Sequence, residues 1–267
     1  MKMKKLRIFS ILLLLVSTGV FLLFQAYTRV VKDDTPPVVR CESEELHVSV
    51  TASEEELLKD VEAIDKRSGD VSDTLVVESV SGFTDENTRV VTYAAVDKNM
   101  NVGRCERTLV YTDYQEPKFN LTAPLCFREG SNINILSCIS AESVLDGSLT
   151  SNIKYSLEKT VNTSVTGYYP VEFRVMDSGG KTVYLNAQVE IYSREYSGVE
   201  VQLKEYLLYL KTGDAFNPAE HYVGSSQEGT LQIQSDVDTS KAGTYYVDYI
   251  VTANTLQGKS RLVVVVQ

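Results

Sequence analysis

One strand-like pattern occurs three times in this chain and constrains the fold more than any other feature. The copies are residues 87–97, 167–177 and 243–253, at offsets of 80 and 76 residues. In each copy, apolar residues recur at every second position. They are Val91, Tyr93 and Ala95, then Val171, Phe173 and Val175, then Val247, Tyr249 and Val251. Side chains with this spacing share one face of a β-strand and can bury it in a core. An offset of domain size predicts one structural unit built three times.

Turns and one helix can also be placed from the sequence. Asp97–Asn101 and Asp177–Lys181 predict hairpin turns after the first two copies, because Asp, Asn and Gly favour tight turns. Segment 67–73 parallels segment 145–151, and the third copy has no convincing equivalent. Residues 53–59 predict one short helix, with Ser as the N-cap and acidic residues in the first turn.

These motifs resemble bacterial Ig-like repeats, a broad group that includes hyalin-repeat and cadherin-like surface modules. The resemblance is carried by Pro36-Pro37, Gly-Asp-Val-Ser at 69–72, Asp-Gly-Ser-Leu-Thr at 146–150, Gly-x-Tyr-x-Val, and the Asp plus Asn/Gly turns. It covers residues 35–192, and residues 195–267 more loosely. The resemblance implies β-sandwich domains that act as stalks, adhesion modules or accessory domains beside an enzyme.

The N-terminus carries a second strong signal. A basic cluster precedes the uncharged run from Ile8 to Thr28, which as a helix would reach about 30 Å, the thickness of a bilayer's hydrocarbon core. The basic flank should stay in the cytoplasm, so the rest of the chain is expected outside. A cleaved signal peptide is the alternative. Cleavage after Ala26 would place Phe24 at the −3 position, which fits badly, so we favour an uncleaved signal-anchor.

We therefore predict an all-β protein of three tandem Ig-like β-sandwich domains after a single transmembrane helix. It would be a single-pass protein of the cell membrane with its C-terminal part extracellular. The predicted segments are a cytoplasmic basic tail at 1–7, a transmembrane signal-anchor at 8–28, a juxtamembrane stalk at 29–34, and Ig-like domains at 35–113, 114–194 and 195–267.

Charge narrows the range of partners. The chain has 26 basic and 36 acidic residues, a formal net charge of −10. Nucleic acids and anionic lipid headgroups attract cationic surfaces, so neither is expected as a partner. We interpret the acidity as a solubility feature of an exported protein. The predicted partners are the membrane, through the N-terminal helix, and a protein or glycan ligand on the cell surface.

Four cysteines, an even number, suggest disulfides in an exported chain. They are Cys41, Cys105, Cys126 and Cys138, and three pairings are possible. If each bond stays within its domain, Cys41 pairs with Cys105 and Cys126 pairs with Cys138. The short ligand spacing of a zinc site does not occur.

The sequence contains no motif for catalysis, so no enzyme activity and no cofactor are predicted. His47 and His221 are the two histidines, and neither lies near a nucleophile motif. No phosphate-binding loop and no dinucleotide-binding fingerprint occur.

Several carboxylates at predicted turns are candidates for calcium ligands, because hard cations bind carboxylate and carbonyl oxygens. They are Asp65, Asp70, Asp97, Asp146 and Asp177. Asp side chains also stabilise turns by themselves, and the EF-hand pattern is absent. We favour plain turns and predict no metal site.

The sequence favours a non-enzymatic adhesion or spacer module on a bacterial surface. A carbohydrate- or cell-wall-binding module is one alternative, and a subunit of an envelope complex is another. Tyrosine is abundant, at 16 residues, and could stack on sugar rings where it faces outward. The candidates for such a platform are Tyr168, Tyr206, Tyr209, Tyr222 and Tyr246. We favour mixed core and edge packing for these tyrosines.

Overall fold

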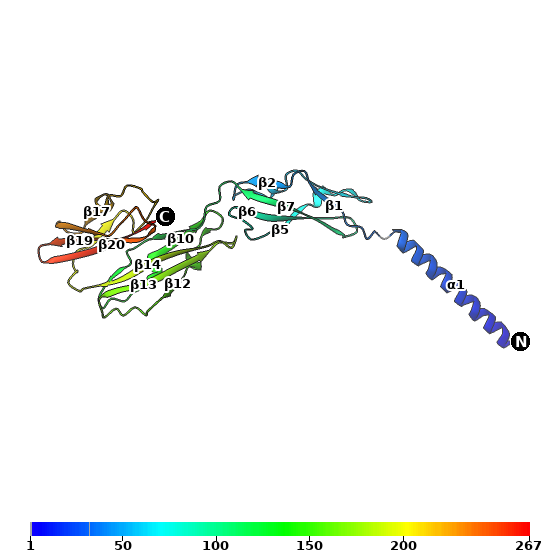
Figure 1. Ribbon diagram of the computed structural model, residues 1–267. Coiled ribbons are helices and arrows are strands. Elements are labelled where there is room, and N and C mark those ends of the chain that lie inside the picture. Colours follow the sequence, from blue (N-terminus) through cyan, green and yellow to red (C-terminus); the bar gives the residue numbers. More distant parts are fainter. Residues whose placement is uncertain (1, 32) are drawn as a thin grey trace. The chain divides into compact units, whose positions relative to one another are not determined.

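The computed structural model describes residues 2–31 and 33–267, with side chains described for residues 7–28 and 33–267. It confirms the predicted all-β fold class, because one long N-terminal helix is followed, in the described residues, by twenty β-strands and only short helical turns (Figure 1). The chain divides into two compact units, Met1–Thr112 and Asp113–Gln267.

Helix α1 (Lys2–Val31) is apolar along most of its length. Its segment Arg7–Thr28 has 22 residues, a mean hydropathy of 2.4 and no buried residues, so it is long and apolar enough to cross a membrane. This segment agrees with the predicted span at 8–28. Membrane-spanning helices and signal sequences share this length and composition.

The first unit contains two sheets. One has the strand order β1-β3-β4 and the other β2-β7-β6-β5. The strands are β1 (Val38–Cys41), β2 (Glu45–Val48), β3 (Val61–Asp65), β4 (Gly69–Asp70), β5 (Val76–Val80), β6 (Thr88–Val96) and β7 (Val102–Tyr111). Two short helices connect them, α2 (Glu54–Leu57) and the 3₁₀ turn η1 (Ser72–Thr74). Helix α2 confirms the predicted helix at 53–59, and Ser53 and Glu56 form a capping box at its start.

The second unit contains four sheets, with the orders β11-β10-β8, β12-β13-β14-β9, β15-β17 and β16-β20-β19-β18. Its first strands are β8 (Lys118–Leu121), β9 (Cys126–Arg128), β10 (Ile139–Ser143), β11 (Gly147–Ser148), β12 (Lys154–Leu157), β13 (Gly167–Met176) and β14 (Thr182–Tyr192). The others are β15 (Val201–Leu203), β16 (Leu207–Leu210), β17 (Tyr222–Ser225), β18 (Thr230–Ser235), β19 (Gly243–Ala253) and β20 (Leu256–Val266). The 3₁₀ turns are η2 (Ile135–Cys138), η3 (Thr150–Asn152) and η4 (Pro218–His221).

The same topology is built three times. Each four-stranded sheet contains an antiparallel hairpin, formed by β6 and β7, by β13 and β14, or by β19 and β20. A short strand from earlier in the copy pairs in parallel with the second hairpin strand: β2 with β7, β9 with β14, and β16 with β20. The sequence repeat is therefore a repeat of sheet topology.

The alternating residues of the repeat form the cores. Each of the nine predicted core positions is at most 3% exposed. Full burial of one such apolar side chain stabilises the fold by roughly 1.5–3 kcal/mol. Glu172 and Arg174, which alternate with them on β13, are exposed as predicted.

Two of these core positions combine burial with a hydrogen bond. Tyr93 on β6 donates its hydroxyl to the carbonyl of Leu57 in α2 at 2.7 Å. Tyr249 on β19 donates to the carbonyl of Pro218 in η4, also at 2.7 Å. A buried hydroxyl needs such a partner. The second copy has Phe173 at this position, which requires none.

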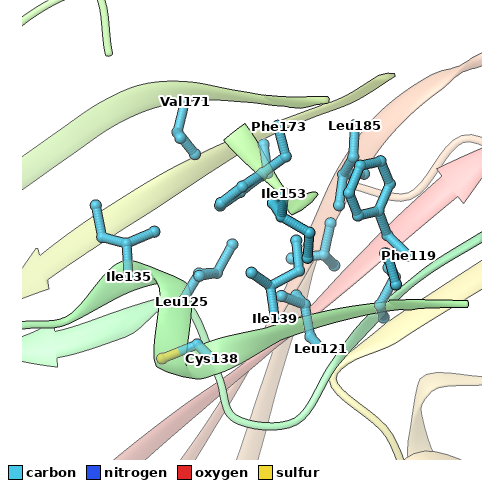
Figure 2. Close-up of a cluster of buried hydrophobic side chains, with 14 of the residues drawn as sticks. Phe119, Leu121, Leu125, Ile135, Cys138, Ile139, Ile153, Val171, Phe173 and Leu185 are labelled. Atoms are coloured by element: carbon cyan, nitrogen blue, oxygen red, sulfur yellow. The ribbon is translucent and has the colours of Figure 1, made fainter. Parts of the chain in front are cut away.

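The second sheet pair packs around one buried cluster and the third around another, and strands β16 and β20 of the third pair contribute to both. Figure 2 shows part of the first cluster, where Phe119, Leu125, Ile139 and Phe173 lie close together. Leu207 on β16 and Val263 on β20 belong to the same buried cluster. The third sheet pair therefore packs on the second, which explains why the predicted boundary at 194/195 lies inside one compact unit.

A buried group of four charges lies within this second unit. Glu190 on β14 accepts a hydrogen bond from Lys259 at 2.6 Å, and Lys259 Nζ also lies 2.9 Å from Asp248 Oδ2. Arg261 makes two hydrogen bonds to Asp248, at 2.6 and 2.9 Å, and its Nη2 lies 3.0 Å from Glu190 Oε2. These side chains are 3–13% exposed. Two positive and two negative charges balance, and together they connect β14 to the β19–β20 hairpin.

Replacing one of these charges should destabilise the second unit. We expect Arg261→Met to lower its free energy of unfolding by about 3–5 kcal/mol, because Asp248 and Glu190 would keep buried charges without their partner. Lys181→Met is the matched control. It removes a pair with Glu116 whose side chains are 37% and 55% exposed, and exposed pairs contribute about 0–1 kcal/mol. Denaturant unfolding of both variants would measure the difference, and equal losses would contradict the role of the buried group.

Candidate functional site

Three aspartates from distant parts of the sequence meet in the first unit. Asp33 lies between α1 and β1, Asp65 ends β3, and Asp97 follows β6. Each offers a carboxylate oxygen, and these oxygens lie within 4.8 Å of one another. The three residues are 5%, 2% and 4% exposed. We call them the aspartate cluster.

Backbone amides hold one oxygen of Asp33 and of Asp65. Asp33 Oδ1 accepts hydrogen bonds from the amide and the hydroxyl of Thr35, at 3.1 and 2.5 Å. Asp65 Oδ1 accepts hydrogen bonds from the amides of Arg67 and Ser68, at 2.8 and 2.5 Å. In both residues the local turn therefore fixes the orientation of the carboxylate.

Asp97 is held by the hairpin turn between β6 and β7. Its Oδ1 accepts hydrogen bonds from the amides of Asn99 and Asn101, both at 2.8 Å. The side chain of Asn101 donates to Asp97 Oδ2 at 2.8 Å and to the backbone carbonyl of Asp33 at 3.0 Å. Asn101 thus connects the hairpin to the segment that precedes β1.

The remaining oxygens of two aspartates are buried without a hydrogen bond. Among the described residues, no donor bonds to Oδ2 of Asp33 or to Oδ2 of Asp65. Arg67 Nε lies 3.9 Å from Asp33 Oδ2, and the Arg67 side chain is half exposed. One arginine at this distance leaves the cluster with excess negative charge. Buried carboxylate oxygens normally have partners, so this arrangement needs an explanation.

The local hydrogen bonds keep two of the carboxyl groups ionised. The hydrogen bond from the Ser68 amide, together with that from Arg67, holds the pKa of Asp65 below its ordinary value of 3.8. Burial would raise the pKa of Asp97, but the hydrogen bonds from Asn101 and Asn99 outweigh burial and lower it. These contributions are present above pH 4 and are lost as the pH falls through the lowered pKa values. Near neutral pH, both groups are therefore carboxylates.

The donor set of the cluster suits a hard divalent cation. It consists of carboxylate oxygens, which calcium and magnesium prefer, and it includes no histidine or cysteine. Oxygens on opposite sides of one Ca²⁺ lie about 4.6–5.2 Å apart, since Ca–O distances are about 2.3–2.6 Å. Three carboxylate oxygens within 4.8 Å of one another can therefore share one ion.

The structure brings together two of the five calcium candidates, Asp65 and Asp97. Asp70 instead accepts a hydrogen bond from the amide of Ser72, at 2.9 Å, as expected for a plain turn. Asp146, in the second unit, accepts one from the amide of Ser178 at 2.9 Å. Both lie outside the aspartate cluster.

Sequence reasoning missed Asp33, although a signal was present. Asp33 stands four residues before Pro37, and Asp113 stands four residues before Pro117 in the next copy. The predicted first domain begins at residue 35 and excludes Asp33, because the repeat is defined by its strands and not by the segment that precedes them.

The second copy has different residues at the positions that correspond to the aspartate cluster. Asp177 corresponds to Asp97, and Ser143 replaces Asp65, since Ser143 pairs with Gly147 as Asp65 pairs with Gly69. Tyr114 donates its hydroxyl to Asp177 Oδ2 at 2.6 Å. Burial and this hydrogen bond raise the pKa of Tyr114. A neutral hydroxyl thus pairs with the carboxylate.

The third copy has lost the acidic position altogether, because Ala253 stands where the first two copies have Asp97 and Asp177. Among the residues described by the structure, a cluster of three metal-ligating side chains occurs in the first unit alone. The position that follows the first hairpin strand therefore has different surroundings in each of the three copies.

The structure brings one of the two predicted cysteine pairs together. Cys41 on β1 and Cys105 on β7 belong to different sheets, and their Sγ atoms lie 2.7 Å apart. Cys138 lies in the core shown in Figure 2, with Sγ 3.7 Å from the carbonyl of Asn134. Cys126 is buried on β9 near Glu190, and burial raises the pKa of its thiol to about 12. Cys126 and Cys138 thus have different surroundings.

No family model matches this chain. The pesticidal crystal protein Cry22Aa of Bacillus thuringiensis is 26% identical over 199 residues, which cover 71% of this chain and 27% of that protein. The chain therefore spans about a quarter of the length of this curated relative.

Solved structures that resemble the chain include two multidomain proteins. One contains the CBM51-2 domain, in complex with GlcNAc, and INT domains of Clostridium perfringens ZmpB. It is 12% identical with a TM-score of 0.24, over 86% of this chain and 42% of that chain. The other is human CDH23 EC21-23, at 10% identity and a TM-score of 0.24, over 86% of this chain and 100% of that chain. TM-scores this low carry no argument about function.

The proximity of Cys41 and Cys105 makes their disulfide testable. We expect non-reducing peptide mapping of protein purified without reductant to recover a Cys41–Cys105 bond. Replacing both with serine should lower the stability of the first unit by about 2–4 kcal/mol, because the unfolded chain would lose a long covalent loop. Wild-type protein under reducing conditions provides the control. Alkylation of both thiols in untreated protein would contradict the prediction.

Proposed function

We propose that this chain is a membrane-anchored, non-enzymatic surface protein whose tandem β-sandwich domains act as an adhesion or spacer module. The observation that carries the proposal is the succession of one apolar helix and three sheet pairs of the same topology. The helix would anchor the chain in the cell membrane, with the C-terminal part extracellular.

The packing within the second unit supports a mechanical role. The third sheet pair contributes Leu207 and Val263 to the core of the second, and a buried charge network joins the two, so this unit should resist bending between them. A spacer or adhesion module transmits position and force through such a rigid body. The proposal includes no catalytic residue: His47 is exposed beside Glu45, and His221 pairs with Glu205 and stacks on Phe216.

Topology can be tested on intact cells. We expect an epitope added after Gln267 to be reached by antibody and removed by external protease, while the protein stays in the membrane fraction after carbonate extraction. Intact mass should show that residues 1–28 are retained, which separates a signal-anchor from a cleaved signal peptide. A protected epitope would contradict the proposed orientation. A partner that co-purifies in detergent would favour a subunit of an envelope complex.

One surface feature favours carbohydrate binding as a second candidate function. A groove of about 690 Å³ in the second unit is lined by residues that include Asn186, Gln188 and Tyr246. A neighbouring hollow of about 390 Å³ shares Gln188 and Tyr246 and adds Tyr168 and Gln234. Carboxamides that bond sugar hydroxyls, next to aromatic rings, are typical of sites that bind polar ligands with an apolar face.

Arg261 packs against the two tyrosines of this smaller hollow. Its guanidinium lies 4.9 Å from the ring centre of Tyr168 and 5.1 Å from that of Tyr246. Tyr168 is nevertheless 57% exposed, so much of its ring is open to a ligand. Two of the five tyrosines considered in the sequence thus line the smaller hollow beside the groove.

The groove and the adjoining hollow predict a specific loss of glycan binding. If the chain binds a glycan across them, Tyr168→Ala should lower its affinity for cell-wall fragments or arrayed glycans about tenfold or more, since stacking on the ring in the hollow would be lost. Tyr184→Ala is the matched control, because Tyr184 is 58% exposed on β14 and does not line the groove. Melting curves of both variants would exclude unfolding as the cause. Equal binding by both variants, or no binding by the wild type, would rule out this second function.

A further inference from the structure

We propose that Asp33, Asp65 and Asp97 bind one Ca²⁺ ion, and that this ion fastens the segment joining α1 and β1 to the first sandwich. The proposal concerns the aspartate cluster alone. It does not depend on whether the sandwiches act in adhesion or as a spacer.

The first argument is the buried oxygen of Asp65. This residue is 2% exposed, its Oδ1 is taken by backbone amides, and its Oδ2 has no hydrogen-bond partner among the described residues. Oδ2 of Asp33 is likewise buried without a hydrogen bond. A bound cation supplies the missing partner for both oxygens. It also offsets the repulsion among three carboxylates within 4.8 Å of one another.

The second argument concerns the choice of cation. Magnesium requires near-ideal octahedral geometry and usually keeps several water ligands, whereas calcium accepts six to eight oxygens in irregular arrangements. All three aspartates are at most 5% exposed, which leaves little room for a shell of water. The local turns also fix the carboxylates in an arrangement set by the chain. Both features favour calcium over magnesium.

The third argument is that the three ligands are held unequally. Asp65 ends a strand that pairs with both β1 and β4, and Asp97 lies in the turn of the long β6–β7 hairpin. Asp33 lies outside any strand, in the segment after Val31, where α1 ends. It contacts the sandwich through its backbone carbonyl, which accepts a hydrogen bond from Asn101, and through its carboxylate, which lies 3.9 Å from Arg67 Nε. Without the ion, repulsion therefore acts mainly on the segment that contains Asp33.

The next fixed point after Asp33 is Pro37. Pro37 is buried, and its carbonyl lies so close to Gly103 that a Cβ there would come within 1.9 Å of the oxygen. The residues between, 34–36, are exposed. The ion would therefore add a point of attachment at Asp33, four residues before the one at Pro37, between this segment and the sandwich.

The test uses the full chain in detergent, stripped of metal with a chelator and then titrated with CaCl₂. We expect calcium to raise the Tm of the first unit by at least about 5 °C at concentrations well above Kd. Hydrogen exchange at residues 33–35 should slow at least about tenfold. Magnesium at the same concentration should have a smaller effect on both measurements.

Two substitutions separate a ligand from a structural aspartate. Asp65→Asn should weaken the calcium response at least about tenfold. In chelator, the same variant should be as stable as the wild type or more stable, because one charge leaves a repelling cluster while the turn keeps its acceptor oxygen. A merely structural Asp65 would give no change in the calcium response. Asp177→Asn, at the corresponding position of the second copy, is the control and should respond to calcium like the wild type.

Each outcome decides one part of the proposal. The absence of any Tm shift in wild-type protein, or equal losses in Asp65→Asn and Asp177→Asn, would overturn the calcium site. A Tm shift without slower exchange at residues 33–35 would overturn the fastening of the linker. These measurements use purified protein, so they do not depend on the tests of topology or of adhesion.

Discussion

Burial of one face of a repeated strand is the interaction on which the rest of this structure depends. In β6, β13 and β19, three side chains at alternate positions are almost completely buried, and the facing sheet covers them in each copy. Each burial contributes roughly 1.5–3 kcal/mol, so the three positions together fix which face of each hairpin points inward. A shift of register by one residue would expose all three, which is why the alternation specifies the pairing so strongly. This burial fixes the positions of the strands, and the strands in turn place the turns, the helix cap and the candidate sites.

The three copies differ mainly in what lies at their ends and edges. The first copy belongs to one compact unit and the second and third to another, in which Leu207 and Val263 of the third copy join the buried core of the second. Buried charges reinforce this association, because Glu190 of one copy meets Lys259 and Arg261 of the next. Such charges cost desolvation energy and are tolerated only when all partners are present. They therefore favour one particular arrangement of the two copies over other apolar contacts of similar area.

The aspartate cluster shows that the side chains at the end of the first hairpin strand can differ between copies without a change of fold. The hairpin turn is the same in the first two copies, since Asp97 and Asp177 both accept a hydrogen bond from the amide four residues on. In the first copy, two further carboxylates face this position, whereas in the second a tyrosine hydroxyl does. The third copy has an alanine there. Burial of the strand fixes the backbone at this position in all three copies, so the side chains there can vary.

The sequence by itself determined the fold class, the three copies and the apolar helix, because alternation, turn residues and hydropathy are local properties of the chain. It also identified Asp65 and Asp97 as turn aspartates. Only the tertiary structure decided that they meet Asp33, since that contact joins residues 32 and 64 positions apart through sheet packing. The same holds for the approach of Cys41 to Cys105, and for the packing of Leu207 and Val263 of the third copy into the core of the second. Periodicity reports which face of a strand is buried, but the neighbour that covers this face depends on how the whole chain packs.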